Sequence, residues 1–556
     1  MLLKEEGDTE ELFHGRRLRK SLNIPLLKRW ICTCSDRCRS EGDLQSPSAT
    51  ASPARVIDTR RLMIQQTPPN CDYAALSYTW GPENITQLEL TKDNEPQLTK
   101  PGGLKGVRRE IPRTIRHAIW LCRKLGINYL WVDALCRGKG DGYEGEKEIK
   151  DIPLIFAKAC LTIVGNGRNS HRGLKGVESS HSPYRHQISR LVGHLSLAVS
   201  KPLIDQSMKN SGWKKRLWPF EEWFVSRRLL ILADHQAFFC CKAKRMIYSE
   251  DTCSEVMGDS GPVISIDNLP QIDHFWSCHE GWDGGFDVYA AHAEEYANRY
   301  VTNEDDLSSG FDMVKRSLEN KLGPQFHYNL PVEFFAQALC FAILSGRRRS
   351  SSKFPSWSWQ GWNVSGQSVQ PGYSGLYYES RWGFKPLGPP ATYFYTSKSS
   401  GLGSFQFESI YDRLRTGHEA VSPLFSDHEP PCPAIIEELP DALKEHLVAF
   451  SALTVELFTY KSDDDNGDWV VAVQDGGQAN EKVGSAILNL ADDQTNKGYF
   501  KFVLIGFCCP HIDGEYNEFL LVVSPSGYEN VFCRVGCCLS LGKFRGRTKR
   551  EMVYLI

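Results

Sequence analysis

The sequence predicts an α/β N-terminal domain with a mainly parallel sheet flanked by helices, followed by a helical middle region and a β-rich C-terminal part. Strand-like and helical segments alternate between residues 73 and 164, helical segments occupy much of 283–345, and short strand-like runs follow from residue 354. Alternating strands and helices favour right-handed crossovers and parallel pairing. The composition divides the 556 residues into four regions: a variable leader (1–55), the α/β domain (56–250), a helical middle region (251–345) and a β-rich region (346–556).

The leader is polar and basic and ends in the Ser/Pro-bearing run SPSATASPAR. We expect it to be loosely ordered. Within it, the run WICTCSDRC holds three cysteines, whereas a structural zinc site normally has four ligands, so ordinary thiols are favoured over a metal site.

The first predicted strand and helix are separated by a polar connection. Residues 73–80 form a short β-prone run that Gly81 and Pro82 end. In residues 111–125, apolar side chains recur at helical spacing, with a proline at the start and Gly126 after the end. This pattern predicts an amphipathic helix.

Two more strands complete the predicted alternation. Residues 127–132 are mostly apolar, as in a buried strand, and Asp133 follows them. A glycine-rich loop leads to a predicted helix at 146–159, which Pro153 should kink or shorten. Residues 160–164 then form a strand that a glycine ends. Because ligands gather at the carboxyl ends of parallel strands, we expect a site near Trp80, Gly81 and Asp133.

The second half of the chain carries weaker signals. Helices are predicted at 310–322 and 332–344. Five strand-like runs follow at 453–460, 469–473, 500–506, 519–523 and 531–539. Trp357 and Trp359 are separated by one residue, and this spacing would place both side chains on the same side of a strand. We expect them to pack with Trp362 against the body of the protein, because burial of an aromatic ring removes a large apolar area from water.

Composition narrows the classes of function. The formal net charge is −2, so the chain lacks the global basic field that holds nucleic acid or an anionic membrane. No apolar run reaches the ~18 residues that span a bilayer, and the first residues are acidic rather than basic and apolar as in a secretory signal. We therefore expect a cytoplasmic protein without a membrane span, whose eighteen cysteines are buried thiols rather than a disulfide framework.

Three catalytic-looking strings have simpler interpretations. The run GDSGP at 258–262 lacks the surroundings of a serine-protease nucleophile. Cysteines at 508–509 and 533–538 flank strand-like text, which favours buried thiols over zinc. The run GDGYEG at 140–145 follows a strand and precedes a helix, as a dinucleotide fingerprint does. No acidic residue ends the next strand, so a surface loop is favoured, with a phosphate-binding loop as the alternative.

Five segments together resemble the fungal heterokaryon-incompatibility (HET) domain. They are residues 75–81 (ALSYTWG), 111–119 (IPRTIRHAI), 125–136 (LGINYLWVDALC), 155–164 (IFAKACLTIV) and 216–230 (RLWPFEEWFVSRRLL). The resemblance continues through 296–302 and 354–362 and covers about 56–365.

The resemblance implies a fungal protein that triggers regulated cell death after non-self recognition. It also implies a distant relation to TIR domains, some of which cleave NAD through a helix-borne glutamate. Aligned on the family's pattern, Glu148 occupies the glutamate position and Asp141 keeps an acidic identity. Lys139 and Gly140 replace the family's Gln and Asp, and Gly145 replaces its Trp, which puts catalysis in this chain in doubt.

Two hypotheses of function follow. In the first, the HET domain is an interaction and signalling module that binds protein partners in non-self recognition and self-associates. In the alternative, it is an NAD hydrolase without a metal or cofactor, in which Glu148 stabilises the ribosyl cation and Asp133 orients the ribose or the loop. The residues expected to bind the substrate are Ser77, Tyr78, Trp80, Gly81 and Asp141. The altered loop favours the interaction module.

Overall fold

The structure is a computed structural model in which two compact units, residues 1–279 and 280–556, are each described by themselves. The described residues are 15–40, 52–82, 87–138, 151–177, 186–193, 195–208, 211–242, 246–252, 285–323, 325–344, 346–350, 353–364, 376–377, 385–386, 394–399, 405–409, 431–461, 469–473, 481–490, 497–510, 516–540 and 547–556.

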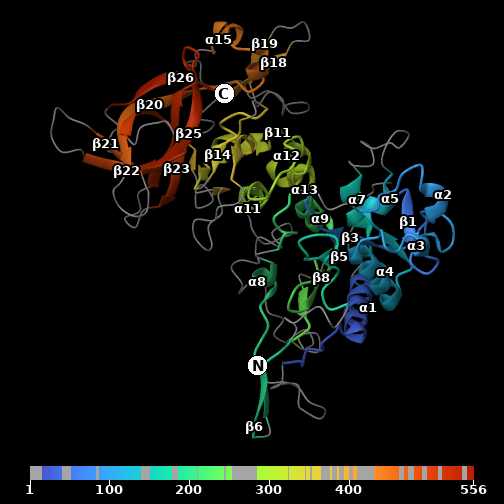
Figure 1. Ribbon diagram of the computed structural model, residues 1–556. Helices are drawn as coiled ribbons and strands as arrows, with labels where there is room; N and C mark the ends of the chain where they lie inside the picture. Colours follow the sequence, from blue (N-terminus) through green and yellow to red (C-terminus); the bar gives the residue numbers. More distant parts are fainter. Residues whose placement is uncertain are drawn as a thin grey trace. The chain divides into compact units, whose positions relative to one another are not determined.

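The first unit is built on an eight-stranded sheet in the order β10-β9-β8-β5-β3-β4-β1-β2. Figure 1 labels β1, β3, β5 and β8 of this sheet. The strands are β1 (Arg55–Asp58), β2 (Met63–Gln66), β3 (Tyr73–Tyr78), β4 (Tyr129–Trp131), β5 (Leu161–Gly165), β8 (Arg228–Leu232), β9 (Ala237–Cys241) and β10 (Met246–Ser249). The central strand β3 is buried along its whole length, as a strand covered on both faces must be.

The three predicted strands are neighbours in this sheet, with β3 between β4 and β5, and both pairings are parallel. Strand β8 continues the parallel set beside β5. The outer pairings are antiparallel, so the sheet is mixed and the predicted parallel arrangement holds for its four central strands only. Short connections account for the pairs β1–β2, β8–β9 and β9–β10, since a short turn can join antiparallel strands but not parallel ones; β1 and β4 pair without such a connection.

Helices cover the sheet. The helix α4 (Arg113–Leu125) confirms the predicted amphipathic segment and ends at Gly126 in the left-handed conformation. The helix α7 (Ile152–Lys158) corresponds to the second half of the predicted helix at 146–159, and its proline lies in the first turn, where proline is tolerated. Short helices complete the unit: α2 (Glu95–Leu98), α3 (Gly103–Gly106), α5 (Asp133–Cys136), α8 (Ile204–Met208) and α9 (Trp218–Val225).

The expectation of a loosely ordered leader is wrong for residues 24–40, which form the helix α1 (Ile24–Ser40). Trp30 is fully buried and its ring stacks on Tyr248, with Phe239 beside it. The helix contacts both α4 and β9. Apolar residues at helical spacing in a polar, basic segment therefore form part of the core of the first unit.

The second unit begins with helices: α11 (Gly285–Ala297), α12 (Asp306–Ser309) and α13 (Asp312–Leu322). The last of these confirms the prediction at 310–322. The predicted helix at 332–344 is much shorter, because a 3₁₀ turn (η5, Val332–Phe334) and α14 (Phe335–Ala338) give way to the strand β13 (Ala342–Ile343).

Six long strands of the second unit close on themselves, because β20 pairs with both β21 and β23 in the ring β20-β21-β22-β25-β24-β23. They are β20 (Val448–Lys461), β21 (Trp469–Val473), β22 (Glu481–Leu488), β23 (Lys497–Pro510), β24 (Tyr516–Pro525) and β25 (Val531–Ser540). All five strand-like runs predicted in the C-terminal part lie in this ring, and an apolar cluster including Leu457, Phe502 and Val522 forms a core there.

Shorter elements complete the second unit. They are β11 (Phe326–His327), β12 (Leu330–Pro331), β14 (Arg347–Arg348), η6 (Trp359–Gly361), β15 (Trp362–Asn363), β16 (Leu376–Tyr377), β17 (Lys385–Pro386), β18 (Phe394–Ser399), β19 (Phe405–Ser409), α15 (Ala434–Glu438), α16 (Asp441–Lys444) and β26 (Lys549–Leu555). Within the described parts of the chain, no helix is long and apolar enough to cross a membrane.

Trp357, Trp359 and Trp362 are buried, as predicted, at 0%, 1% and 2% exposure. The predicted strand geometry for the first two is wrong, because Trp357 lies in a turn and Trp359 is the first residue of η6. Each indole N–H finds an acceptor inside the unit, on His446, Tyr289 and Ser356 respectively.

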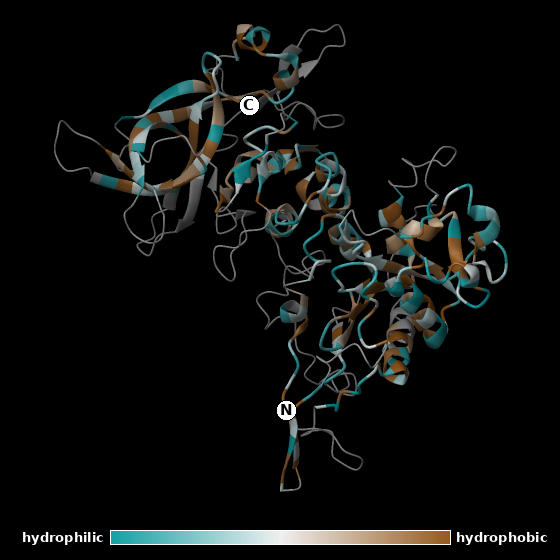
Figure 2. Cartoon of the chain, in the orientation of Figure 1, coloured by the Kyte–Doolittle hydropathy of each residue, from teal (hydrophilic) through white to brown (hydrophobic). Residues whose placement is uncertain are grey.

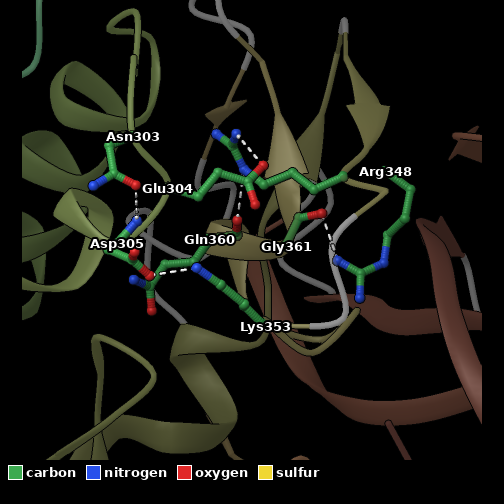
Figure 3. A network of polar contacts seen from close by, with 8 residues as sticks. Asn303, Glu304, Asp305, Arg348, Lys353, Gln360 and Gly361 are labelled. Carbon is green, nitrogen blue, oxygen red and sulfur yellow. Dashed lines mark hydrogen bonds and ion pairs between the residues drawn. The ribbon is translucent and has the colours of Figure 1, made fainter. Parts of the chain in front are cut away.

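A polar network contacts the segment that carries Trp357, Trp359 and Trp362 (Figure 3). Arg349 donates to the carbonyl of Gln360 at 2.9 Å and pairs with Glu304 at 3.4 Å. Lys353 pairs with Asp305 at 2.5 Å. The network thus connects the turn to the segment just before α12.

The burial of Trp30 predicts that α1 stabilises the first unit. Trp30→Ala should lower the free energy of unfolding by about 3–5 kcal/mol, because it leaves a large cavity beside the sheet. Chemical denaturation of the full chain measures this. Lys28→Ala, on an exposed position of the same helix, is the matched control, and equal effects of the two substitutions would show that α1 is not part of the core.

Candidate functional site

The order of the central strands defines where a ligand site is expected. Along the chain β3 is followed by β4 on one side, and the next connection returns past β3 to β5 and then β8. The chain therefore reverses direction across the sheet between β3 and β5. The crevice outside the carboxyl ends of strands at such a reversal is the usual ligand position in open α/β sheets.

An acidic–aromatic cluster lies at these carboxyl ends. Its members are Ser77, Tyr78, Trp80, Asp133 and Glu222. The first two end β3 and the third follows it, Asp133 follows β4, and Glu222 lies in α9, the helix before β8. Two parallel strands and a helix thus bring together side chains that are up to 145 positions apart in the sequence.

Asp133 holds the indole of Trp80 by its edge. The Trp80 Nε1–H donates to Asp133 Oδ2 at 2.9 Å, and the backbone N–H of Ala134 donates to Oδ1 at 2.7 Å. Burial raises the pKa of Asp133, and these hydrogen bonds oppose the rise. The hydrogen bond from Nε1 holds the indole in one orientation. Both side chains are partly exposed, so solvent still reaches the pair.

A directional chain of hydrogen bonds positions Glu222. The indole N–H of Trp213 donates to Ser77 Oγ at 2.6 Å, and Ser77 in turn donates to Glu222 Oε2. An indole nitrogen can only donate, so the serine accepts from Trp213 and its own proton points to the carboxyl group. Among the described residues, the other oxygen of Glu222 has no hydrogen-bond partner, and it is not one of the buried unsatisfied atoms.

The surroundings favour the neutral form of Glu222. Burial raises its pKa from 4.5 to about 8, the negative charge of Asp133 adds to the rise, and the bond from Ser77 opposes it. At neutral pH the carboxyl group is therefore mostly protonated. Because Oε2 accepts from Ser77, Oε1 is the oxygen of Glu222 that is available to carry the proton.

Tyr78 and Gly81 complete the surroundings. Tyr78 is 7% exposed and donates to Gln87 Oε1 at 3.2 Å. Burial and then the charge of Asp133 raise its pKa well above its usual value. Gly81 has φ 115°, a conformation that strongly favours glycine, and it lets the chain turn away directly after Trp80.

The structure thus brings four predicted residues, Ser77, Tyr78, Trp80 and Asp133, into one cluster and places Gly81 directly after Trp80. Glu148 and Asp141 lie outside the described residues.

Glu222 was not predicted as a site residue, although it lies in the HET-like segment 216–230. The available signal was a pair of glutamates inside the aromatic run WPFEEWFV, which must pack on a sheet. A carboxyl group in such a position is either paired or functional.

Comparison with known proteins found one family model that matches part of the first unit. Residues 73–222 match the family model of Heterokaryon incompatibility protein (HET). Over this range the chain is similar to the HET family; the range begins at the first residue of β3, ends at Glu222 and contains the whole cluster. No curated protein and no solved structure matches the chain.

The raised pKa of Glu222 predicts a pH-dependent cost to stability. In the unfolded chain the group ionises near pH 4.5, whereas in the folded protein it stays neutral to about pH 8. Wild-type stability should therefore fall as pH rises through this window, and Glu222→Gln, which cannot ionise, should not share the loss. Each unit of pKa difference is worth about 1.4 kcal/mol. Because Glu222 is partly exposed, we expect about 2 kcal/mol in total.

Urea unfolding of wild type and Glu222→Gln at about pH 5 and about pH 9 measures this effect. The variant should gain relative stability at the higher pH. Glu110→Gln, at an exposed position, is the control. A stability difference between wild type and Glu222→Gln that is equal at both pH values would contradict a raised pKa.

Proposed function

We propose that the HET domain triggers regulated cell death in fungal non-self recognition, in the cytoplasm, by cleaving the nicotinamide–ribose bond of NAD at the acidic–aromatic cluster. One observation carries the proposal. Glu222, whose burial raises its pKa to about 8, is held by Ser77 beside the Trp80–Asp133 pair at the carboxyl ends of the parallel strands. The HET match relates the chain to heterokaryon incompatibility, and the resemblance to TIR domains suggests the substrate.

The reaction suits a single carboxyl group. The bond between C1′ of the ribose and the nicotinamide nitrogen breaks, and its electron pair stays with nicotinamide, which leaves as a neutral molecule. The ribose becomes cation-like, and a water oxygen bonds to C1′ and loses a proton, so the products are ADP-ribose, nicotinamide and H⁺. A carboxylate close to C1′ stabilises the developing positive charge.

The protonation state of Glu222 changes in the direction that the reaction needs. Without ligand the group is largely neutral at pH 7 because burial and Asp133 disfavour its charge. The nicotinamide ring of NAD carries a positive charge, which favours the carboxylate when it lies nearby. Binding should therefore release a proton from Glu222 and leave a carboxylate that can accept the proton of the attacking water.

Trp80 is better placed than Tyr78 to stack on a ring of the substrate. Tyr78 is buried and its hydroxyl is held by Gln87, whereas the indole of Trp80 is partly exposed. Asp133 binds the edge of that indole and so leaves its face free of the hydrogen bond. We assign Trp80 to stacking and Asp133 to its orientation.

The interaction module remains the competing function, and it requires no chemistry at the cluster. The decisive difference is the product, because a pure interaction module releases no nicotinamide from NAD.

The test is to incubate the purified full chain with NAD and to follow nicotinamide release by chromatography. Wild type should release nicotinamide, and Glu222→Gln should lose at least about 100-fold in rate, because removal of a group that stabilises transition-state charge has effects of this size. Trp80→Ala should raise KM more than it lowers kcat, since stacking contributes mainly to binding. Glu110→Gln serves as the unaffected control.

Two outcomes would overturn the assignment. Wild-type protein that releases no nicotinamide would transfer the function to the interaction module. If Glu148→Gln abolished release while Glu222→Gln did not, the reacting carboxylate would be Glu148, as the aligned family pattern suggests. When the same variants are overexpressed in fungal cells, those that release nicotinamide faster should cause more cell death.

A further inference from the structure

The first unit carries a second, separate two-stranded sheet made of β6 (Ser189–Val192) and β7 (Leu195–Ala198). Figure 1 shows this hairpin extending away from the eight-stranded sheet. Residues 188 and 199 continue the pairing, because the N–H of Val199 donates to the carbonyl of Ile188 at 2.9 Å. A two-stranded hairpin is only marginally stable by itself and normally packs one face on another element.

One face of the hairpin is aliphatic and exposed. Residues that pair across the strands share a face, and so do alternate residues along each strand. The register therefore groups Ile188 with Val199, Arg190 with Leu197, and Val192 with Leu195. We call the five aliphatic members of this set the hairpin face: Ile188, Val192, Leu195, Leu197 and Val199.

The exposure of the hairpin face is unusual for aliphatic side chains. Ile188, Val192 and Val199 are 60%, 56% and 59% exposed, and Leu197 is 37% exposed. These four account for almost half of the large hydrophobic side chains that are exposed in the described chain. Figure 2 shows the hydrophobic residues of the hairpin at a distance from the core of its unit. An exposed apolar patch, here divided by Arg190, is typical of an interaction site.

The opposite face and the base attach the hairpin to the unit. Ser196 and Ala198, on the other face, are buried. At the base, the N–H of Lys201 donates to Asp251 at 2.8 Å, and the N–H of Leu18 donates to Gln187 at 3.1 Å. The hairpin is therefore attached through Ser196, Ala198 and its base, whereas the hairpin face is exposed to solvent; Leu191, on the attached face, is also exposed.

We propose that the hairpin face is a self-association surface that packs against the same face of a second copy of this chain. A flat aliphatic ladder is complementary to itself about a twofold axis, and two such faces can stack about 10 Å apart as in a β-sandwich. Its exposed side chains present on the order of 400 Å² per copy, about half of the roughly 800 Å² that each partner of a standard interface buries. The dimer is therefore weak and depends on concentration.

The composition of the hairpin argues for protein rather than lipid as the partner. Residues 186–203 contain no Trp, Tyr or Phe, whereas segments that insert into the membrane interface typically carry such side chains. A membrane surface is the alternative that the experiment must exclude.

Arg190 limits the affinity of this surface. It lies across from Leu197, in the middle of the hairpin face, so a twofold arrangement brings two guanidinium groups close together. Their stems can pack on the aliphatic side chains while the charges turn to water. An inward-facing charge on an open sheet is a known device against uncontrolled association.

The test uses analytical ultracentrifugation of the full chain over a range of micromolar concentrations. Wild type should show a monomer–dimer equilibrium, and Leu197→Asp should raise the dimer dissociation constant at least about tenfold, since it places a charge at the centre of the interface. Leu191→Asp is the matched control, because Leu191 is 71% exposed on the other face of the same hairpin and should leave the dimer unchanged. Arg190→Leu should tighten the dimer at least about tenfold.

Several outcomes would overturn the proposal. These are a wild-type chain that stays monomeric throughout, a dimer that is insensitive to Leu197→Asp, or equal loss in Leu197→Asp and Leu191→Asp. Binding of the monomeric chain to vesicles of phosphatidylcholine and phosphatidylserine, lost in Leu197→Asp, would instead assign the surface to a membrane. Circular dichroism verifies that each variant is folded. Nicotinamide release is a separate measurement, so failure of either proposal is recognised independently of the other.

Discussion

The hydrogen-bond chain from Trp213 through Ser77 to Glu222 is the constraint on which the acidic–aromatic cluster depends. Ser77 is 1% exposed in the central strand β3, so its hydroxyl group needs partners inside the protein. The indole of Trp213 supplies the donor and Glu222 the acceptor. This requirement holds α9 against the carboxyl end of β3 and keeps a carboxyl group in a place where burial and Asp133 disfavour its charge.

The order of the strands explains why the other members of the cluster lie close to the Ser77–Glu222 hydrogen bond. Because the chain reverses between β3 and β5, the end of β3 is flanked by parallel strands on both sides, and α9 crosses from β5 to β8 beside it. Asp133 reaches the same point from the end of β4 and binds Trp80. A partly exposed indole, a buried hydroxyl group and two carboxyl groups therefore meet here, and each lies in a helix or strand or within two residues of one.

Periodicity in the sequence predicted the elements of this region well, and contacts between distant segments poorly. The run at 73–80 and the segment at 111–125 identified β3 and α4, because burial on both faces of a strand and on one face of a helix leaves a direct pattern. Glu222 and Trp30 were missed because their roles depend on the tertiary partners Ser77 and Tyr248, which no local pattern reveals. The antiparallel pairing at the edges of the sheet depends in part on the length of the connections. The exposure of the hairpin face depends on the absence of a covering element among the described residues, which a local pattern does not predict.

The titration midpoint of Glu222 shows whether its carboxyl group is neutral at pH 7 in the folded protein. Carbon-13 NMR of protein labelled at glutamate carboxyl groups, with the resonance assigned through its loss in Glu222→Gln, would give the titration midpoint of this one group. The account predicts a midpoint of about 8 in wild type, and a higher midpoint in Ser77→Ala, because the serine bond favours the ionised form. A midpoint near 4.5 that Ser77→Ala leaves unchanged would contradict the account.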